Sequence, residues 1–471
     1  MKTNKLHAHP LATARRILAL VFFIGISLLF LVPGSMIHKY LGWMAHLQLL
    51  PALLALNLGV LLIMIVLTLL FGRIYCSVIC PMGVFQDLIS RLSSKRKGKK
   101  FRFTYSPEKK WLRYTVLLLF IIAIVAGAMP LASLIAPYSA FGRMLSSIYS
   151  HSAYNIIVAV VTFLSIFLFA WTGGRAYCNS ICPVGTVLGF LSRFSLFKIR
   201  IDESKCNSCG LCSRKCKSSC IDFAEHKVDY SRCVDCMDCL ETCHHGAISF
   251  SLRKKEKGVE SGDMGRRAFL AAGAITLTSS TLKAQQRKVD GGFAVIEDKK
   301  VPERSNPIVP AGAQGNWHLA RHCTACQLCV SVCPNEVLRP STRLETLMQP
   351  EASYENGYCR PECTKCSEVC PTGAIQRITK EEKSSIQIGH AVWIRENCLP
   401  LRDGVKCGNC ARHCPVGAIS MVKSDPSREN SPRIPAINTE RCIGCGACEY
   451  LCPSRPFSAI YVEGHKKHRI I

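Results

Sequence analysis

The sequence predicts an α-helical membrane domain followed by small α+β modules that are rich in cysteine. Three observations lead to this fold class: four long apolar runs in the first 200 residues, a short motif that occurs twice among them, and cysteines gathered in regularly spaced sets. The chain has 471 residues, 29 of them cysteine, and this length is enough for about three domains. Thiols grouped in this way are typical of metal ligands rather than of a disulfide framework.

The apolar runs cover residues 16–33, 50–71, 112–130 and 154–172. Each is nearly uncharged and about 20 residues long, the length that a helix needs to cross the hydrocarbon core of a membrane. Buried core helices are the alternative, but four of them in one half of a chain would be unusual. No small-residue cleavage site follows the first run, so we expect an anchor rather than a removed signal peptide. Residues 1–200 are predicted to form a four-helix transmembrane domain made of two related two-helix hairpins.

The distribution of basic residues predicts the orientation in the membrane. Lysine and arginine precede the first run, follow the second and follow the fourth, whereas the other two connections carry few of them. The positive-inside rule then places the N-terminus, residues 72–111 and residues 173–267 in the cytoplasm. The basic run Lys95–Lys100 fits this orientation and contact with anionic lipids better than nucleic-acid binding. Much of the net charge of +27 therefore concerns topology.

The repeated motif reads GRIYCSVICPMG from Gly72 and GRAYCNSICPVG from Gly174. It ends the second and fourth apolar runs, which predicts two hairpins with parallel topology and both thiol pairs on the same side. If the helix continues through the motif, each cysteine pair lies at i and i+4 on one face. Packing of the hairpins could gather four sulfurs to bind metal, or leave two dithiols open to redox chemistry. Small, inert buried cysteines are the alternative, but repetition of the whole pattern favours a catalytic role for Cys76, Cys80, Cys178 and Cys182.

The next two sets, CNSCGLCSRKC from Cys206 and CVDCMDCLETC from Cys233, have the spacing of two-cluster bacterial ferredoxins. Three thiolates at steps of three wrap one corner of a [4Fe–4S] cube, and the fourth reaches the other cube. Residues 201–252 are therefore predicted to bind one cluster through Cys206, Cys209, Cys212 and Cys243, and a second through Cys233, Cys236, Cys239 and Cys216. Zinc usually takes two CxxC knuckles instead. Lys217 and His244 replace the usual prolines, and Cys220 is an extra thiol that could compete with Cys216 as ligand.

Residues 253–284 form a junction. A charged linker leads to Arg266 and Arg267, followed by Phe269, Leu270 and a run of small apolar residues. This resembles a twin-arginine export signal, which serves proteins that take up cofactors before they cross the membrane. We expect an internal signal, left by the fusion of two ancestral proteins, that acts as a fifth span. An ordinary basic linker with a short surface helix is the alternative, because the apolar stretch is short for a span.

Residues 285–471 contain four more sets, each ending in Cys-Pro. The second set opens its first interval by one residue, and the third carries an eight-residue interval there. The sixteen cysteines predict four cubane clusters, and TGAIQRI and VGAISMV fit the short strands of ferredoxin-like modules. The first set could exchange its fourth ligand with the fourth set and the second with the third, or neighbouring sets could pair. The predicted ligands are Cys323, Cys326, Cys329, Cys333, Cys359, Cys363, Cys366, Cys370, Cys398, Cys407, Cys410, Cys414, Cys442, Cys445, Cys448 and Cys452.

Six [4Fe–4S] clusters without another cofactor fingerprint predict electron transfer rather than group chemistry. The sequence has no P-loop, no Gly-x-Gly-x-x-Gly after a strand, no HExxH and no CxxCH haem site. The direction of electron flow cannot be read from the ligands, because cluster potentials vary with environment. His38, His46 and His151 near the outer ends of spans are candidates for a quinol site, although each could be an interfacial histidine.

These motifs resemble a known pair of proteins. Residues 1–250 look like the NapH-type membrane iron–sulfur protein, and residues 264–471 look like the NapG/MauM-type ferredoxin, including its irregular second and third sets. The resemblance implies a quinol dehydrogenase module, in which menaquinol or ubiquinol is oxidised at the membrane part and electrons pass to the exported ferredoxin part. A periplasmic reductase or cytochrome would be the acceptor. It further implies a multi-pass protein of the bacterial inner membrane, with residues 201–252 in the cytoplasm and residues 285–471 in the periplasm.

A maturation factor is the rival interpretation. Some membrane iron–sulfur proteins with the same Cys-x-x-x-Cys-Pro pairs reduce metal during oxidase assembly, and the long C-terminal row of clusters argues against that role here. A redox sensor would need a flavin or an output domain. The quinol interpretation has one difficulty: two clusters lie on one side of the membrane and four on the other, and the sequence offers no visible cofactor between them.

Overall fold

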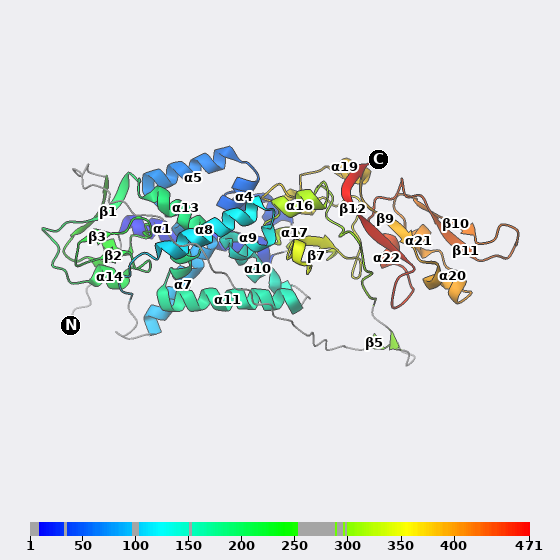
Figure 1. Cartoon of the computed structure of the whole chain (residues 1–471), viewed down its shortest axis with the longest axis horizontal. Helices are drawn as coiled ribbons and strands as arrows, with labels where there is room; N and C mark the ends of the chain where they lie inside the picture. The colour runs from blue at the N-terminus through cyan, green and yellow to red at the C-terminus, as the bar shows by residue number, and fades with distance from the viewer. Residues whose placement is uncertain are drawn as a thin grey trace.

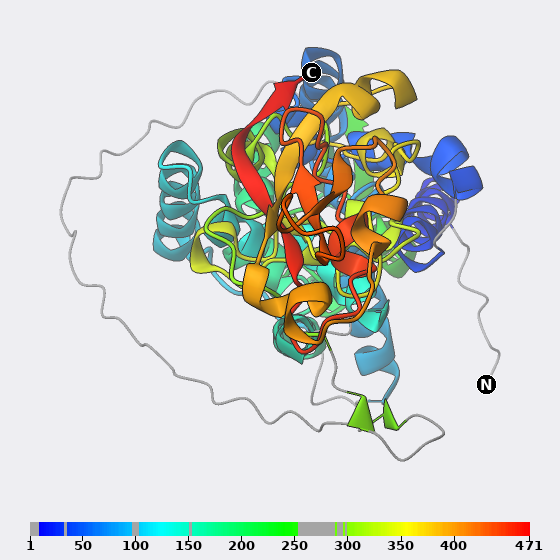
Figure 2. The same cartoon turned by 90° about the vertical axis from the view of Figure 1, so that its right-hand side faces the viewer.

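The computed structural model describes residues 9–32, 35–96, 103–149, 153–252, 288–289, 295–296 and 299–471. The molecule is elongated, with a helical part in the middle, residues 197–252 at one end and residues 299–471 at the other (Figure 1). We call these two ends the inner and the outer ferredoxin part. Viewed along the long axis, the outer part covers the helical part (Figure 2). The twin-arginine-like segment, His151 and residues 97–100 of the basic run lie outside the described residues.

Two of the four predicted spans are single helices. They are α1 (Pro10–Leu31) and α11 (Ala153–Gly173). Within the described residues, these are the two helices that are long and apolar enough to cross a membrane. The predicted first and fourth spans therefore exist as continuous helices.

The second and third predicted spans are each interrupted. The second consists of α4 (Leu49–Leu54) and α5 (Leu58–Phe71); Leu56 between them has φ +51°, and the Asn57 side chain accepts a hydrogen bond from Val60 N at 3.3 Å to start α5. The third consists of α8 (Lys110–Val125) and α9 (Met129–Ile135), and Pro130 lies in the first turn of α9. The prediction of unbroken helices is wrong here, because local capping residues stop each helix before its apolar run ends.

Both copies of the repeated motif fold alike. Gly72 (φ +71°) and Gly174 (φ +63°) end the preceding helices in a left-handed conformation that favours glycine. A one-turn helix follows, and a proline starts the next helix: α6 (Ile74–Val78) and α7 (Pro81–Arg96), then α12 (Ala176–Ser180) and α13 (Pro183–Ser192). The helix does not continue through the motif, so the condition for placing each cysteine pair on one helical face is not met, and the second cysteine of each pair lies at the junction between two helices.

Short helices complete the helical part. They are α2 (Ser35–Leu41), α3 (Trp43–His46) and α10 (Pro137–Ser146), the last followed by the 3₁₀ turn η2 (Ser147–Tyr149).

The inner ferredoxin part is a small α+β module. Strands β1 (Phe197–Ile201) and β4 (Ile248–Leu252) pair antiparallel, from Phe197 opposite Leu252 to Ile201 opposite Ile248. The second pair is β2 (Ile221–Asp222) with β3 (Lys227–Val228), and the helices are α14 (Leu211–Lys215) and α15 (Asp238–Thr242).

The outer ferredoxin part holds three antiparallel strand pairs: β7 (Leu338–Pro340) with β8 (Pro350–Ala352), β9 (Ile386–Trp393) with β12 (Ile460–Ile470), and β10 (Ile419–Lys423) with β11 (Arg433–Ile437). VGAISMV supplies most of β10, as predicted, whereas TGAIQRI forms no strand. The helices are α16 (Asn316–His322), α17 (Leu328–Ser331), α18 (Lys365–Glu368), α19 (Lys380–Ser385), α20 (Leu399–Arg402), α21 (Asn409–Arg412) and α22 (Ala447–Tyr450), with 3₁₀ turns η3 (Leu344–Thr346) and η4 (Arg395–Asn397). A further pair, β5 (Lys288–Val289) with β6 (Val295–Ile296), precedes them.

One apolar core joins the helical part to the outer part. It runs from Phe30 and Tyr75 through Phe141 to Leu328 and Val337 without interruption. The inner part has a smaller core of its own around Ile199, Cys220 and Ile248. The repeated motif and the cysteine sets of the outer part therefore share one packed core, and most of the inner part packs around a second.

Candidate functional site

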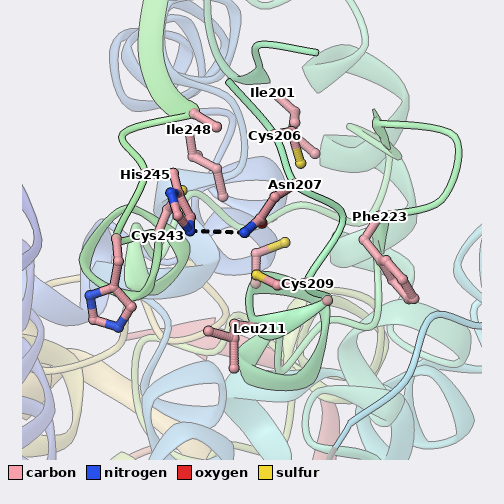
Figure 3. Close-up of a pocket in the computed structure, with 13 residues that line it drawn as sticks. Ile201, Cys206, Asn207, Cys209, Leu211, Phe223, Cys243, His245 and Ile248 are labelled. Atoms are coloured by element: carbon pink, nitrogen blue, oxygen red, sulfur yellow. Dashed lines mark hydrogen bonds between the residues drawn. The ribbon is translucent and has the colours of Figure 1, made fainter. Parts of the chain in front are cut away.

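The first cysteine set of the inner part surrounds a cavity of about 90 Å³. Cys206, Cys209 and Cys212 line it together with Cys243 from the second set (Figure 3). Asn207 Nδ2 and His245 Nε2 lie 2.9 Å apart at this cavity. The structure thus brings together the four thiols that the spacing assigns to one cluster. A cavity ringed by four sulfurs and apolar side chains has the donor set of an iron–sulfur cube, so the residues fit the group.

The second set of the inner part is more deeply buried. Cys216, Cys233 and Cys239 are 6–8% exposed, and Cys239 lies close enough to Cys233, Cys236 and Cys216 to interact electrostatically with each. The extra thiol, Cys220, lies inside this set, with its Sγ 3.4 Å from the Sγ of Cys216. Cys220 is therefore close enough to compete with Cys216 as a cluster ligand.

In the outer part, the third and fourth sets exchange their fourth cysteines. One cavity is lined by Cys398, Cys407 and Cys410 of the third set with Cys452 of the fourth. A neighbouring cavity is lined by the first three cysteines of the fourth set with Cys414 of the third.

The first and second sets are paired in the same way. Cys370, the last of the second set, lies within electrostatic range of Cys323, Cys326 and Cys329. Cys333, the last of the first set, is equally close to Cys359 and Cys366. Of the two arrangements that the sequence left open, the structure has the one in which neighbouring sets pair.

In the outer part, the pair formed by the first and second sets lies next to the pair formed by the third and fourth sets. Cys359 N donates a hydrogen bond to Cys445 O at 2.9 Å, which joins the second set to the fourth. Tyr354 is buried between them, and its hydroxyl donates to Gly444 O at 2.7 Å. Cys448 in turn lies near Cys410 of the third set. The six sets therefore form a row along the long axis, from α14 at one end to α20 and α21 at the other (Figure 1).

The four cysteines of the repeated motif lie in the interior, between the inner and the outer part. Cys76 and Cys80 are each 4% exposed, and Cys178 and Cys182 are each 3% exposed. Cys182 interacts electrostatically with all three others, and Cys178 with Cys76. The structure thus gathers the two thiol pairs, which we call the cysteine quartet. Gln86 Nε2 donates to Cys178 Sγ at 3.1 Å, and Gly185 N donates to Cys182 Sγ at 3.4 Å.

The two repeats bind each other through their arginines. Arg73 Nη2 donates to Cys178 O at 3.2 Å, and Arg175 Nη1 donates to Cys76 O at 2.8 Å. Both arginines are completely buried. A Cβ at Gly83 would lie 2.1 Å from Cys76 O, and one at Gly185 would lie 2.3 Å from Cys178 O, so each repeat needs glycine where its helix approaches its own first cysteine.

On the side that faces the inner part, buried charged residues connect the cysteine quartet to the second cysteine set of the inner part. Asp87 Oδ1 accepts from Arg175 Nε at 2.7 Å, and Asp87 Oδ2 lies 3.3 Å from Lys217 Nζ and 3.4 Å from Arg15 Nη1. Arg175 is also close to both Cys178 and Cys236. Arg73 N donates to Asp235 Oδ2 at 3.0 Å, and Asp235 lies between Cys233 and Cys236 in sequence.

On the side that faces the outer part, aromatic and cationic residues connect the cysteine quartet to the first cysteine set of the outer part. Tyr177 lies near Cys178, Cys182 and Arg143, and Arg143 lies near Cys326. A Cβ at Gly142 would be 2.6 Å from Cys326 O. The contact between α10 and α17 is therefore close, and Ser146 Oγ donates to Gln327 Oε1 at 2.6 Å across it.

A cavity of about 590 Å³ lies where α10 and α11 meet the outer part. Its lining includes Ser146 and Asn155 from the helical part and Gln327, Cys333 and Glu351 from the outer part. The quinol-site candidates His38 and His46 do not line it: His38 Nε2 lies 2.9 Å from Leu29 O, and His46 is exposed. Sequence reasoning missed this cavity, because its walls come from segments far apart in the chain.

Comparison with protein families places iron–sulfur modules along most of the row. A family described as a 4Fe-4S binding domain matches residues 53–100 and again residues 155–202, the two copies of the repeat. A 4Fe-4S dicluster domain matches residues 322–398 and 405–455, and a further 4Fe-4S binding domain matches residues 227–248.

Several curated proteins resemble parts of the chain. The putative electron transport protein YccM of Escherichia coli is 30% identical over 177 residues, 36% of this chain and 48% of that protein. The methylamine utilization ferredoxin-type protein MauN of Paracoccus denitrificans is 31% identical over 159 residues, 34% and 53% of the two chains. The ferredoxin-type protein NapF of Escherichia coli is 28% identical over 179 residues, 38% and 99%.

The chain spans about half the length of YccM and MauN, so their whole-protein roles do not transfer with the match. The cysteine sets, the cavities that they line and the matching family models nevertheless agree on multiple 4Fe–4S clusters. The chain therefore carries several ferredoxin-type 4Fe–4S modules, and parts of it are similar to YccM, MauN and NapF.

Proposed function

We propose that the chain is a quinol-linked electron-transfer protein of the bacterial inner membrane, which oxidises quinol and passes electrons through its [4Fe–4S] clusters to a periplasmic reductase or cytochrome. The observation that carries this proposal is the cavity of about 590 Å³ with Cys333 in its wall, at the junction of α10, α11 and the outer part. Cavities of roughly 300–1,000 Å³ suit small organic ligands.

The surface of the helical part supports a membrane location. Large apolar side chains such as Leu58 (75% exposed), Val125 (79%) and Leu168 (60%) project from α5, α8 and α11, and lipid would cover them. With α1 and α11 as spans and the interrupted helices beside them, the inner and outer parts lie on opposite sides of the bilayer. The positive-inside rule assigns the inner part to the cytoplasm.

The cavity offers both kinds of polar group that a quinol head needs. Gln327 Nε2 is buried without a hydrogen-bond partner among the described residues, and so is Glu351 Oε2. The amide would donate to one quinol oxygen, and the carboxylate would accept a proton. Ile308, Val330 and Leu338 supply an apolar wall for the ring.

Electrons and protons balance at this site. Quinol becomes quinone by losing two electrons and two protons, and the protons leave through Glu351 and outside water. Each iron–sulfur cluster accepts one electron at a time. Cys333 lines the cavity, and Gln327 directly follows Cys326, so a quinol there would lie beside the first pair of clusters in the outer part.

The rival role as a metal-reducing assembly factor is less consistent with the quartet. Reduction of an incoming ion by Cys76, Cys80, Cys178 or Cys182 would require access to these thiols, which are at most 4% exposed.

The test is anaerobic. The protein is purified in detergent, a reduced menaquinone analogue is added, and cluster reduction is followed by absorbance and EPR. We expect rapid reduction, which the variant Gln327→Leu slows at least tenfold, while Gln376→Leu, at an exposed glutamine of the same part, leaves the rate unchanged. Clusters that dithionite reduces but quinol does not would refute quinol oxidation.

A further inference from the structure

We propose that Cys76, Cys80, Cys178 and Cys182 bind a seventh iron–sulfur cluster, shared between the two repeats. The proposal concerns a site that does not require quinol; only its role as a relay rests on the proposed function. Two cysteines per repeat are half of the usual ligand set of such a cluster, so both repeats would have to contribute.

The number of ligands is the first argument. A 4Fe–4S binding domain matches each repeat separately, at residues 53–100 and 155–202. Each matched segment contains two cysteines, whereas a [4Fe–4S] cluster is held by four thiolates. Because the structure brings all four thiols into one buried group, a single cluster completed by both repeats satisfies the ligand requirement.

Buried positive charge beside the quartet is the second argument. The guanidinium of Arg73 is completely buried, and its Nη2 lies 3.9 Å from Cys76 Sγ. Its other acceptors are neutral: Asn179 Oδ1, Ser231 O and Cys178 O. Among the described residues no carboxylate forms an ion pair with this guanidinium; Asp235 accepts from the main-chain N of Arg73 and interacts with its charge from a longer distance. Arg113 lies nearby as a second cation and is paired with Glu108.

A buried cation without an ion-pair partner is costly. Four thiolates carry four negative charges, and a [4Fe–4S]²⁺ core leaves a net charge of minus two in the site. Arg73 Nε and Arg175 Nη2 also lack a hydrogen-bond partner among the described residues. An anionic cluster would supply the charge that this pocket is built to balance.

The position of the quartet is the third argument. Arg175 lies close to both Cys178 and Cys236 of the inner part, and Tyr177 with Arg143 connects the quartet to Cys326 of the outer part. The quartet therefore occupies the one interval in the row that crosses the helical part. Because electron tunnelling slows steeply with distance, a cluster here divides that crossing into two shorter steps. One electron enters as one leaves, and no bond or proton is exchanged.

The test compares iron content. The full chain and the variant Cys76→Ser/Cys178→Ser are purified anaerobically in detergent, and iron and acid-labile sulfide are counted per chain. We expect about 28 irons in the wild type and about 24 in the variant, since each cube holds four. Ser77→Ala, a buried neighbour of Cys76, should keep the wild-type content. EPR of the remaining six clusters shows whether the variant is folded. If the variant is not folded, the iron count of the wild type alone tests the proposal.

About 24 irons in the wild type would overturn the proposal. If thiol alkylation then requires prior reduction, the quartet forms disulfides instead. The two proposals fail separately: quinol should still reduce the outer clusters of the variant while the inner clusters stay oxidised. A lower iron count in the variant than in the wild type, together with clusters that quinol does not reduce, would support the seventh cluster and refute the quinol site.

Discussion

Arg73 and Arg175 each bind the main chain of the opposite repeat. Arg73 reaches the carbonyl of Cys178 at 3.2 Å, and Arg175 reaches the carbonyl of Cys76 at 2.8 Å. The exchange is reciprocal, so each repeat completes the pocket of the other. A duplicated hairpin has become a pair that cannot be separated without leaving buried carbonyls and guanidinium groups unpaired.

Alanine at Gly83 should disrupt this pocket. Its Cβ would lie 2.1 Å from Cys76 O, which is main chain and cannot rotate away. We expect Gly83→Ala to shift the Cys76 turn and lower the thermal midpoint of unfolding by several degrees, measured in detergent. Gly59→Ala in α5 is the matched control, because its nearest neighbour is 3.6 Å away. Equal midpoints for both variants would contradict the close approach.

Asp87 is expected to hold the inner part to the helices. It forms ion pairs with Arg15, Arg175 and Lys217. Lys217 also pairs with Asp238 at 2.8 Å, so Asp87→Asn takes the carboxylate partner from the buried Arg15 and Arg175 and should cost about 3–5 kcal/mol. Limited proteolysis should then release the inner part. Asp202→Asn, in an exposed ion pair with Lys205, should change nothing measurable. Resistance to protease equal to that of the wild type would refute the role of Asp87.

Replacement of Cys414 tests the exchange of ligands in the outer part. Because Cys414 lines the cavity of Cys442, Cys445 and Cys448, Cys414→Ser should perturb that cluster and spare the one at Cys398. Cys452→Ser should do the opposite. Potentiometric EPR distinguishes the two, since a different single signal should shift in each variant. The same signal shifting in both would contradict the pairing.

Cys216 and Cys220 are expected to substitute for each other. Their sulfurs lie 3.4 Å apart, so either can reach the same iron after a small movement. The single variants Cys216→Ser and Cys220→Ser should each retain the second inner cluster, and the double variant should lose about four irons. Loss of the cluster in Cys216→Ser alone would show that Cys220 cannot ligate.

Acid should loosen the C-terminal part of β12, where His468 N donates to Gln314 O at 3.2 Å. Burial lowers the pKa of His468 to about 4, and His465 adds repulsion. Between pH 6.5 and 4 the unfolded chain therefore binds a proton that the folded chain excludes, so stability present above pH 6.5 falls by about 3 kcal/mol as the pH drops. Hydrogen exchange of β12, corrected for intrinsic rates, should show this loss, and His468→Gln should abolish it. An unchanged pH profile in that variant would refute the assignment.

The parts of the fold that depend on local spacing were predictable from the sequence. The ligands Cys206, Cys209, Cys212 and Cys243 meet at one cavity as their intervals suggested, because the loop between thiols is too short to do anything else. Asn57 and Pro130 are local signals for the interruptions between α4 and α5 and between α8 and α9. Each apolar run is nevertheless long enough for an unbroken span, so the prediction of unbroken helices overlooked these signals.

Other features depend on contacts between distant segments. TGAIQRI has strand composition, yet its main chain donates to another main chain through Gln376 N, which bonds to Gly312 O at 2.9 Å, while Ala374 N, Ile375 N and Ile378 N donate to side chains. A strand needs a main-chain partner along its length. The pairing of neighbouring sets and the convergence of Cys76 with Cys178 follow from how modules pack, which the spacing of cysteines within one set does not encode.

The row of cysteine sets ends at the molecular surface on both sides, with Cys209 exposed at one end and Cys407 half-buried at the other. Quinol delivers electrons in pairs, whereas each cluster stores one. A chain with this many storage places can take up successive pairs while its exposed ends wait for a partner to collide. The row can thus hold several electrons at once, so that electron uptake from quinol and electron release to the acceptor need not occur at the same time.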